Sequence, residues 1–500
     1  MSNLSELLPA GGAAKEFEVV ASGTLPNGSP VVMKSDGTVE VVAESSTSGV
    51  AIPAGSPSTF NAGTTTYPSL SFDPNNAGKF VVAYADGGNS EYGTAIVGTV
   101  SGTSITFGSE YIFTSVGIRY ASVSFDPNTS GKFVVTWQVT SGEYGKAIVG
   151  TVSGTSISYG SEVTFNAAQT WYGYCAFDPN TANKFMVVYS DEGNGSYGTA
   201  IIGTVSGTSI SFGSEYVVDA THTINMEIAW DPSTTGKAII THRYYGGGVF
   251  YGKATVATVS GTSITFGSAT TFNSGSTNYI SVAYDPSTAG KFVVAYRDKS
   301  NSNYGTAIVG TVSGTSVSFG AEVVFHSGSM SYTSIAFDPA TAGKALIAYR
   351  SSTDGEGAVE IGTVSGTSIT FGSSYVFSSP AVAYTAIAFD PNNAGEFVIS
   401  YRDADDSNYG KAVLNDLTGT IVTTNLTSTN FAGTSTAAFT NGQTATIVPQ
   451  GGVSTNQTSL TIGSTYYIQP AGTLATSAGS PSFVAGKAIS ATSLILKGNS

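Results

Sequence analysis

The chain has 500 residues and a formal net charge of −14 at pH 7, and only 10% of its residues are charged. Soluble domains usually carry roughly 25% charged residues, so Ser, Thr, Asn and Gly supply most of the polar surface. No run of Lys or Arg offsets the negative charge, which argues against nucleic acid and anionic membrane as partners. A hydrophobic content of 41% excludes a disordered chain, and no stretch is long enough to span a bilayer. We therefore expect no nucleic-acid binding and no membrane insertion.

Residues 1–46 open the chain without a recognisable targeting signal. The segment from Met1 to Pro9 has no basic region and no long apolar run, so we expect synthesis in the cytoplasm without a signal peptide. Residues 28–39 predict two short strands joined by a turn that ends in Gly37.

Residues 47–416 contain a sequence repeat. An Asp-Pro pair preceded by an aromatic residue recurs at intervals of 52 to 54 residues, and Val-Ser-Gly-Thr-Ser recurs with the same interval. The repeated aspartates are Asp73, Asp126, Asp178, Asp231, Asp285, Asp338 and Asp390. A period near fifty residues predicts a propeller, a solenoid or an array of modules.

Each copy of the repeat predicts four strands. In one copy, residues 279–284, 291–296 and 304–312 are rich in β-branched and aromatic residues, and a fourth strand begins at Ser316. Apolar runs such as Phe-Val-Val-Ala-Tyr are typical of strands buried on both faces. Four antiparallel strands per repeat are typical of a propeller blade. The sequence therefore predicts an all-β fold, a seven-bladed β-propeller of four-stranded antiparallel blades, over residues 47–416.

The seventh copy lacks its own fourth strand. It begins at Tyr384 and has three strands by Leu414, but no fourth strand with the repeat pattern follows. Residues 48–61 align with residues 261–273, which contain the fourth strand of blade four. We expect the N-terminal segment to supply the missing strand, which would protect the open edges of the array. The alternative is that residues 421–426 supply it.

The two ends of the chain, residues 1–46 and 417–500, resemble each other. Residues 28–39 match residues 463–474, since both read as strand, glycine turn and strand. We predict one small composite β domain made of both ends, with the propeller inserted in it.

The end segments also carry a family resemblance. Residues 440–448, 463–474 and 486–497 resemble the terminal module of structural proteins from tailed bacteriophages, and residues 21–31 are similar to the start of such proteins. The resemblance implies a non-enzymatic virion protein, such as a tail fibre, an adhesin or a capsid decoration protein, that displays the propeller for recognition or decoration. It also implies a homo-oligomer on the virion, with other virion proteins as partners. The second hypothesis is a glycan-binding adhesin of the same build, in which the variable face of the propeller holds a host-surface glycan.

Arginine gives the sharpest signal of binding chemistry. Arginines occupy one equivalent position, at the end of the second strand, in blades four to seven: Arg243, Arg297, Arg350 and Arg402. An arc of guanidinium groups suits a carboxylate ligand. The alternative is that each arginine pairs with a nearby acid, such as Asp298 or Asp403. Sialidases are propellers that bind with an arginine triad, but we cannot place their tyrosine, glutamate and aspartate set here, so a propeller glycosidase remains only a third alternative.

Aromatic residues give a second binding signal. A tyrosine in the first strand recurs at Tyr67, Tyr120, Tyr279, Tyr332 and Tyr384, which marks that position as structural. This comparison predicts that Trp171 and Tyr172 stand outside the repeat, and we expect them to stack on a sugar ring.

The remaining reactive residues give no sign of catalysis. The single cysteine, Cys175, lies in a first strand where other copies carry apolar residues, so we expect core packing. The three histidines share no repeat position and no metal-ligand spacing. No nucleophile elbow, P-loop or dinucleotide motif occurs. We therefore expect no enzyme activity, no metal and no cofactor.

Overall fold

The computed structural model describes residues 16–48, 55–379, 381–418, 420–427, 429–469, 472–477 and 483–497. Strands dominate, and the described helices are two short 3-10 turns, Gly87–Asn89 and Glu192–Asn194. Neither is long and apolar enough to cross a membrane. The chain forms two compact units, which we call the terminal unit (Met1–Gly49 with Thr420–Ser500) and the propeller (Val50–Gly419).

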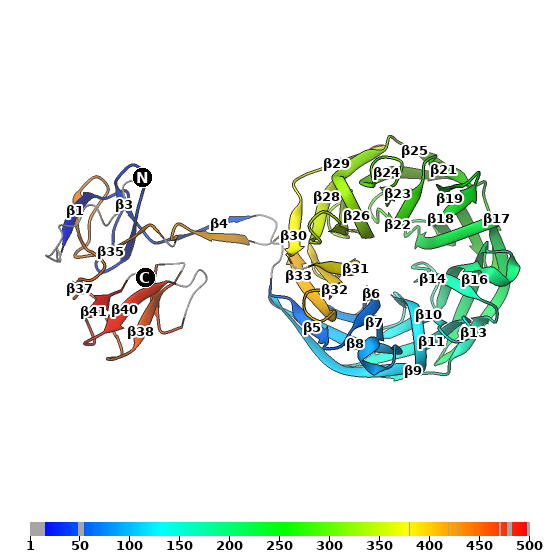
Figure 1. Ribbon diagram of the computed structural model, residues 1–500, viewed down its shortest axis with the longest axis horizontal. Helices are drawn as coiled ribbons and strands as arrows, with labels where there is room; N and C mark the ends of the chain where they lie inside the picture. The colour runs from blue at the N-terminus through cyan, green and yellow to red at the C-terminus, as the bar shows by residue number, and fades with distance from the viewer. Residues whose placement is uncertain are drawn as a thin grey trace. The chain divides into compact units, whose positions relative to one another are not determined.

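The propeller consists of four-stranded antiparallel blades around a common axis (Figure 1). The first strands are β6 (Thr65–Phe72), the end of β9 (Ser104–Phe125), β14 (Thr170–Phe177), the end of β17 (Ser209–Trp230), β22 (Thr277–Tyr284), the end of β26 (Val323–Phe337) and β31 (Val382–Phe389). The second strands are β7 (Lys79–Asp86), β10 (Lys132–Val139), β15 (Lys184–Asp191), β18 (Lys237–Gly246), β23 (Lys291–Asp298), β27 (Lys344–Ser351) and β32 (Glu396–Asp403).

The third and fourth strands complete each blade. The third strands are β8 (Tyr92–Ser101), β11 (Gly145–Ser153), β16 (Tyr197–Ser206), β19 (Val249–Ser260), β24 (Tyr304–Ser313), β28 (Gly357–Ser365) and β33 (Tyr409–Asp416). The fourth are the start of β9, β12 (Ser156–Tyr159) with β13 (Val163–Asn166), the start of β17, β20 (Ser263–Phe266) with β21 (Thr270–Asn273), β25 (Ser316–Phe319) with the start of β26, β29 (Ser368–Phe371) with β30 (Tyr375–Ser378), and β5 (Ser58–Asn61). The predicted seven-bladed, all-β architecture is thus present.

The strand β5 completes blade seven, as the sequence predicted. It pairs with β33 in the register Gly410↔Asn61, Lys411↔Thr59 and Ala412↔Ser58. The part of the expected segment at residues 49–54 lies outside the described residues. The alternative is wrong, because Ile421 lies in β34 (Thr420–Thr424), which pairs with β4 (Glu44–Ser48) in the terminal unit.

The repeated aspartate connects neighbouring blades by a hydrogen bond. Asp73 Oδ1 accepts a hydrogen bond from the Asn75 N–H within its own turn, and Oδ2 accepts one from Gly131 N–H of the next blade at 2.9 Å. Asp390 Oδ2 makes the same bond to Gly78 N–H, at 2.7 Å, between blades seven and one. Blades one and seven are therefore in contact like any other neighbouring pair.

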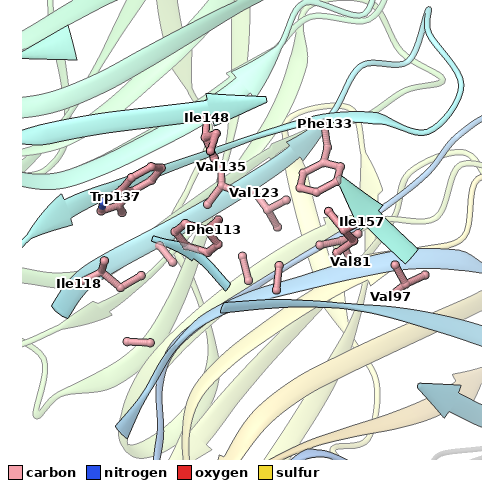
Figure 2. Packing of buried hydrophobic residues seen from close by; sticks show 14 of the residues in the cluster. Val81, Val97, Phe113, Ile118, Val123, Phe133, Val135, Trp137, Ile148 and Ile157 are labelled. Atoms are coloured by element: carbon pink, nitrogen blue, oxygen red, sulfur yellow. The ribbon is translucent and has the colours of Figure 1, made fainter. Parts of the chain in front are cut away.

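The core lies between blades. Val81 and Val97 of blade one belong to one buried cluster with Phe133, Val135 and Trp137 of blade two (Figure 2). Burying such a side chain contributes about 1.5–3 kcal/mol, and a blade inside the array buries both faces in this way. Cys175 lies in the next cluster along and is buried, as expected, and burial raises the pKa of its thiol.

The terminal unit contains two five-stranded sheets with the same topology. The first has the order β1-β36-β35-β2-β3 and the second the order β37-β41-β40-β38-β39. Their strands are β1 (Phe17–Val20), β2 (Pro30–Met33), β3 (Val39–Val41), β35 (Phe431–Ser435) and β36 (Thr444–Val448), and then β37 (Val453–Ser454), β38 (Thr465–Ile468), β39 (Leu474–Ala475), β40 (Val484–Ala488) and β41 (Leu494–Leu496). Taken in chain order, the strands of the first sheet correspond one to one with those of the second.

The strand registers show that the two sheets are copies of one module. The pair Pro30↔Thr434 corresponds to the pair Thr465↔Lys487. In both sheets the next residue pair keeps the register, and the register then shifts, between Val31 and Val32 in the first sheet and between Tyr466 and Tyr467 in the second. The paired strands predicted within residues 28–39 and 463–474 are confirmed at equivalent places, and residues 470 and 471 of the second turn lie outside the described residues. The propeller is therefore inserted between the third and fourth strands of the first copy, as the composite arrangement requires.

Candidate functional site

A strained tyrosine marks the same point in almost every first strand. Each first strand has a bulge, and the residue within it has a positive φ: Tyr67 (53°), Tyr120 (53°), Tyr172 (53°), Asn225 (50°), Tyr279 (48°), Tyr332 (55°) and Tyr384 (53°). Bulky side chains seldom adopt this conformation. Such strain is characteristic of functional sites, and its repetition here projects one residue per blade toward a common point.

The six tyrosines form an arc that we call the tyrosine ring. Neighbouring rings lie 4.6 to 5.3 Å apart between centroids, in tilted contacts favourable for aromatic pairs. The contacts join Tyr172 to Tyr120, Tyr67, Tyr384, Tyr332 and Tyr279 in that order. The arc is interrupted only at blade four, where Asn225 takes the tyrosine position.

The sequence interpretation of Tyr172 needs a correction. Tyr172 does not stand outside the repeat, because it has the same φ and the same ring contacts as the other tyrosines. The signal was available in the sequence, since each ring position lies six residues before the repeated aspartate, as Tyr172 does before Asp178. Trp171 does lie beside the ring, 6.0 Å from Tyr172 and 6.1 Å from Tyr120 between centroids.

The structure brings the predicted arginines to the tyrosine ring. The Cζ atom of Arg297 lies 4.7 Å from the ring centroid of Tyr279, and that of Arg402 lies 4.8 Å from the centroid of Tyr384. Arg350 occupies the equivalent position in β27, one residue before the strand ends at Ser351. Arg243 differs, because its guanidinium lies 4.4 Å from the Phe250 centroid and donates from Nη1 to Asn225 Oδ1 at 2.9 Å.

These four arginines have no acidic partner. Within the described residues no ion pair includes any of them. The alternative that they pair with Asp298 or Asp403 is therefore wrong. Asp298 accepts hydrogen bonds from two N–H groups of its own loop, and Asp403 accepts from two N–H groups and from Lys411 Nζ at 2.8 Å.

The arginines are also partly desolvated. Their Nε atoms are buried and have no hydrogen-bond partner among the described residues. Burial lowers the pKa of Arg243 to about 10, so Arg243 remains cationic at neutral pH, and burial also lowers the pKa of Arg297. A partly buried cation without a counterion is costly, and an anionic ligand would remove that cost.

A cavity of about 670 Å³ lies along the axis, and the first strands line it. The wall of this cavity next to the tyrosine ring contains repeated serines. The Oγ atom of each accepts a hydrogen bond from a backbone N–H group of the following blade. The pairs are Ser69 with Val123, Ser122 with Cys175, Ser281 with Ile335 and Ser334 with Ile387. The serine is replaced by Tyr174 in blade three, Glu227 in blade four and Ala386 in blade seven.

Glu227 and Tyr174 were not singled out by the sequence analysis. Glu227 Oε2 accepts a hydrogen bond from the Val282 N–H at 3.0 Å, so in blade four it replaces the serine as the acceptor for the following blade. Burial raises the pKa of Glu227 to about 8, although its hydrogen bonds oppose the shift. Tyr174 is 40% exposed and lines the same cavity. No group of three or more potential metal ligands occurs among the described residues.

The comparisons with known proteins bear on the fold. No family model matches the chain, and no curated protein matches it. The chain is similar to the BP39L lectin from Burkholderia pseudomallei, with 8% identity, a TM-score of 0.52 and coverage of 72% of this chain and 100% of the lectin. It is also similar to Chaetomium thermophilum Sqt1 bound to the N-terminus of ribosomal protein L10, with 14% identity, a TM-score of 0.46 and coverage of 71% and 89%. A third similar structure is the NanB sialidase from Streptococcus pneumoniae, with 11% identity, a TM-score of 0.41 and coverage of 72% and 69%. At these identities the lectin similarity shows the propeller fold and nothing about the ligand.

Proposed function

We propose that this chain is a non-enzymatic recognition protein whose propeller binds an acidic glycan at the tyrosine ring. The observation that carries the proposal is the set of partly buried arginines, without acidic partners, beside the six tyrosines. Tyrosine faces stack on sugar rings, and guanidinium groups bind carboxylates with two parallel hydrogen bonds. An acidic sugar offers both features in one molecule.

The chemistry of the channel favours binding over catalysis. A tyrosine nucleophile needs a lowered pKa or an adjacent base. Burial and the nearby Glu227 carboxyl instead raise the pKa of Tyr174. Tyr174 and Glu227 place a tyrosine and a glutamate together in the cavity, but a glycosidase of the sialidase kind also needs an acid/base aspartate, and no aspartate is among the described residues that line the cavity.

We assign attachment to the terminal unit. The resemblance of its sequence to phage structural modules supports a place on a virion, as part of a tail fibre or a decoration protein in several copies. Imaging of a gold-labelled antibody against residues 483–497 on purified phage particles tests this part. Label confined to particle-free protein would overturn it.

The glycan proposal is tested with variants of two arginines. Arg243→Ala and Arg297→Ala each remove a guanidinium beside the tyrosine ring, at blades four and five. Isothermal titration would use the methyl glycosides of glucuronic acid, galacturonic acid and N-acetylneuraminic acid, with methyl glucoside as the neutral probe. We expect binding of at least one acidic probe and a loss of tenfold or more in each variant.

A matched control removes one positive charge elsewhere. Lys487→Ala lies in β40 of the terminal unit, and we expect its binding to equal that of the wild type. Equal binding of the acidic and neutral probes, or unchanged binding in both arginine variants, would overturn the proposal.

A further inference from the structure

The polar departures from the repeat inside the channel cluster at two adjacent blades, and the other departure at these positions is the apolar Ala386 of blade seven. Blade four has Asn225 in place of the ring tyrosine and Glu227 in place of the serine, and blade three has Tyr174 in place of the serine. All three residues line the 670 Å³ cavity, as does Arg243. In an array of similar blades, this is the one sector where polar side chains differ at both positions.

Asn225 leaves an interruption in the tyrosine ring. The neighbouring tyrosines, Tyr172 and Tyr279, make no ring contact with each other, whereas every other adjacent pair of ring tyrosines does. The smaller amide also binds the Arg243 guanidinium at 2.9 Å, which places that cation at the interruption. The interruption in the tyrosine ring and the Arg243 cation therefore both lie at blade four.

Glu227 carries a carboxyl group that is not needed to accept the hydrogen bond from the next blade. In four other blades an uncharged serine Oγ accepts the equivalent backbone N–H group of the following blade. Burying a carboxylate costs several kcal/mol unless it is fully partnered, and the raised pKa of Glu227 shows that its partners do not fully compensate. Structure alone would favour the serine, so the carboxyl group points to a ligand.

The residues around this sector are complementary to one kind of molecule. Arg243 offers two parallel donors to a carboxylate. Glu227 and Tyr174 offer an acceptor and a hydroxyl group to sugar hydroxyls. Tyr172 and Tyr279, on either side of Asn225, offer aromatic faces. Because this set occurs once per propeller, it fits one sugar at a chain end and not a series of sites between blades.

We propose that the propeller binds a single terminal acidic sugar at blade four, with its carboxylate on Arg243 and a hydroxyl group on Glu227. This rests on the proposed function and adds to it the orientation of the sugar, its position at a chain end, and a stoichiometry of one. The sugar enters at Asn225, where the ring is interrupted.

The test returns blade four to the repeat. Asn225→Tyr restores the ring tyrosine, and Glu227→Ser restores the serine that accepts the next N–H group, so both variants keep the contacts on which the other blades rely. Ala386→Ser in blade seven is the control, because it makes the same restoration on another part of the cavity wall. Titrations use the acidic methyl glycosides above and record stoichiometry, and circular dichroism checks the fold.

We expect one site per chain, a loss of at least thirtyfold for Asn225→Tyr and at least tenfold for Glu227→Ser, and no change for Ala386→Ser. Arginine variants that lose binding while both blade-four variants bind normally would overturn this inference and leave the proposed function standing. More than one site per chain would overturn it as well. Absence of any binding of the acidic probes to the wild type would overturn the proposed function and this inference together.

Discussion

The propeller and the terminal unit both arose by repetition, but repetition has different consequences in the two. Each blade has two neighbours of the same kind, so positions at the interfaces keep their residues, as the aspartates from Asp73 to Asp390 do. The two modules of the terminal unit have different surroundings. Val448 of the first module is 5% exposed and packs in the cluster shared by both sheets, whereas Ile495, at the equivalent register position, is 42% exposed.

The difference shows how to interpret divergence between copies. In the terminal unit, divergence follows from position, because the two copies occupy unequal environments. In the propeller, the environments are nearly equal, so a divergent residue such as Glu227 needs a cause other than packing. Four predictions test this contrast, in order of expected effect.

The largest effect concerns the terminal unit. Val448→Asp places a charge in the shared cluster, and an uncompensated buried charge costs roughly 3 to 5 kcal/mol. Ile495→Asp at the equivalent position faces solvent and is expected to cost less than about 0.5 kcal/mol. Hydrogen exchange with mass spectrometry, read separately for peptides of each unit, measures both. Equal loss of protection in the two variants would contradict the claim that the modules have unequal surroundings.

The next effect concerns a blade interior. Gly98 in β8 lies opposite Phe80 in β7, and a Cβ at Gly98 would overlap the Phe80 ring. Gly98→Ala is therefore expected to destabilise the propeller by about 2 to 3 kcal/mol. Blade four has alanine at both equivalent positions, Ala238 and Ala257.

That natural pair supplies the control. In a Phe80→Ala background, Gly98→Ala should cost less than about 0.5 kcal/mol, since the obstructing ring is gone. Urea denaturation of the four variants of the cycle gives the coupling energy. A Gly98→Ala cost that is the same in both backgrounds would show that the ring is not the cause.

A third effect is the pH dependence of stability due to Glu227. Its pKa rises from the ordinary 4.5 to about 8 on folding because of burial. The folded state thus holds its proton more tightly than the unfolded state, so the stabilisation is complete below pH 4.5 and is lost as pH rises to about 8. Relative to Glu227→Ser, the wild type should lose about 2 kcal/mol across this window, less than in a dry site because the group lines a cavity.

Denaturant midpoints of the two proteins from pH 4.5 to 8.5 measure this difference. The titratable groups that also line the cavity are Tyr174, Cys175, the ring tyrosines and Arg243. Burial raises the pKa values of the cysteine and of Tyr174, and it lowers the pKa of Arg243 only to about 10, so none of these groups titrates between pH 4.5 and 8 and they do not produce the slope. Parallel pH curves for the two proteins would contradict the assignment.

The smallest effect is a gain. Ala386→Ser restores in blade seven the serine that four other blades use to accept an N–H group of the following blade. One added hydrogen bond should stabilise the propeller by about 0.5 to 1 kcal/mol. Thermal unfolding at fixed pH detects it, and a loss of stability would show that the seam between blades seven and one differs from the others.

Much of the propeller could be predicted from the sequence because its determinants repeat. The period gave the blade count, and the missing fourth strand of blade seven led to β5. The arginine positions also followed from alignment, but their partners did not. Whether Arg297 contacts Asp298 or Tyr279 depends on the bulge in β22, and that bulge leaves no mark in the sequence beyond a recurrent tyrosine.

The polar residues of blade four were missed for a related reason. Asn225 and Glu227 do not stand out among the other polar residues of the chain, and they become unusual only when each first strand is counted back from its aspartate. Their partial burial is a property of the channel, which forms only when all the first strands come together. The sequence pattern therefore predicts the blades, whereas the residues that depart from the repeat inside the channel are recognised only in the assembled structure.

The way the propeller is inserted has a further consequence. The outgoing strand β4 and the returning strand β34 pair along their length, from Glu44↔Thr424 to Ser48↔Thr420, and Asn425 at the base bonds Ala43 in both directions. The chain therefore leaves the first module of the terminal unit and re-enters it at the same place, so this module does not depend on the sequence that lies between β4 and β34. A guest of any size whose own ends meet can occupy that position, so the propeller could be exchanged for another domain, and the proposed recognition could change while the proposed attachment is kept.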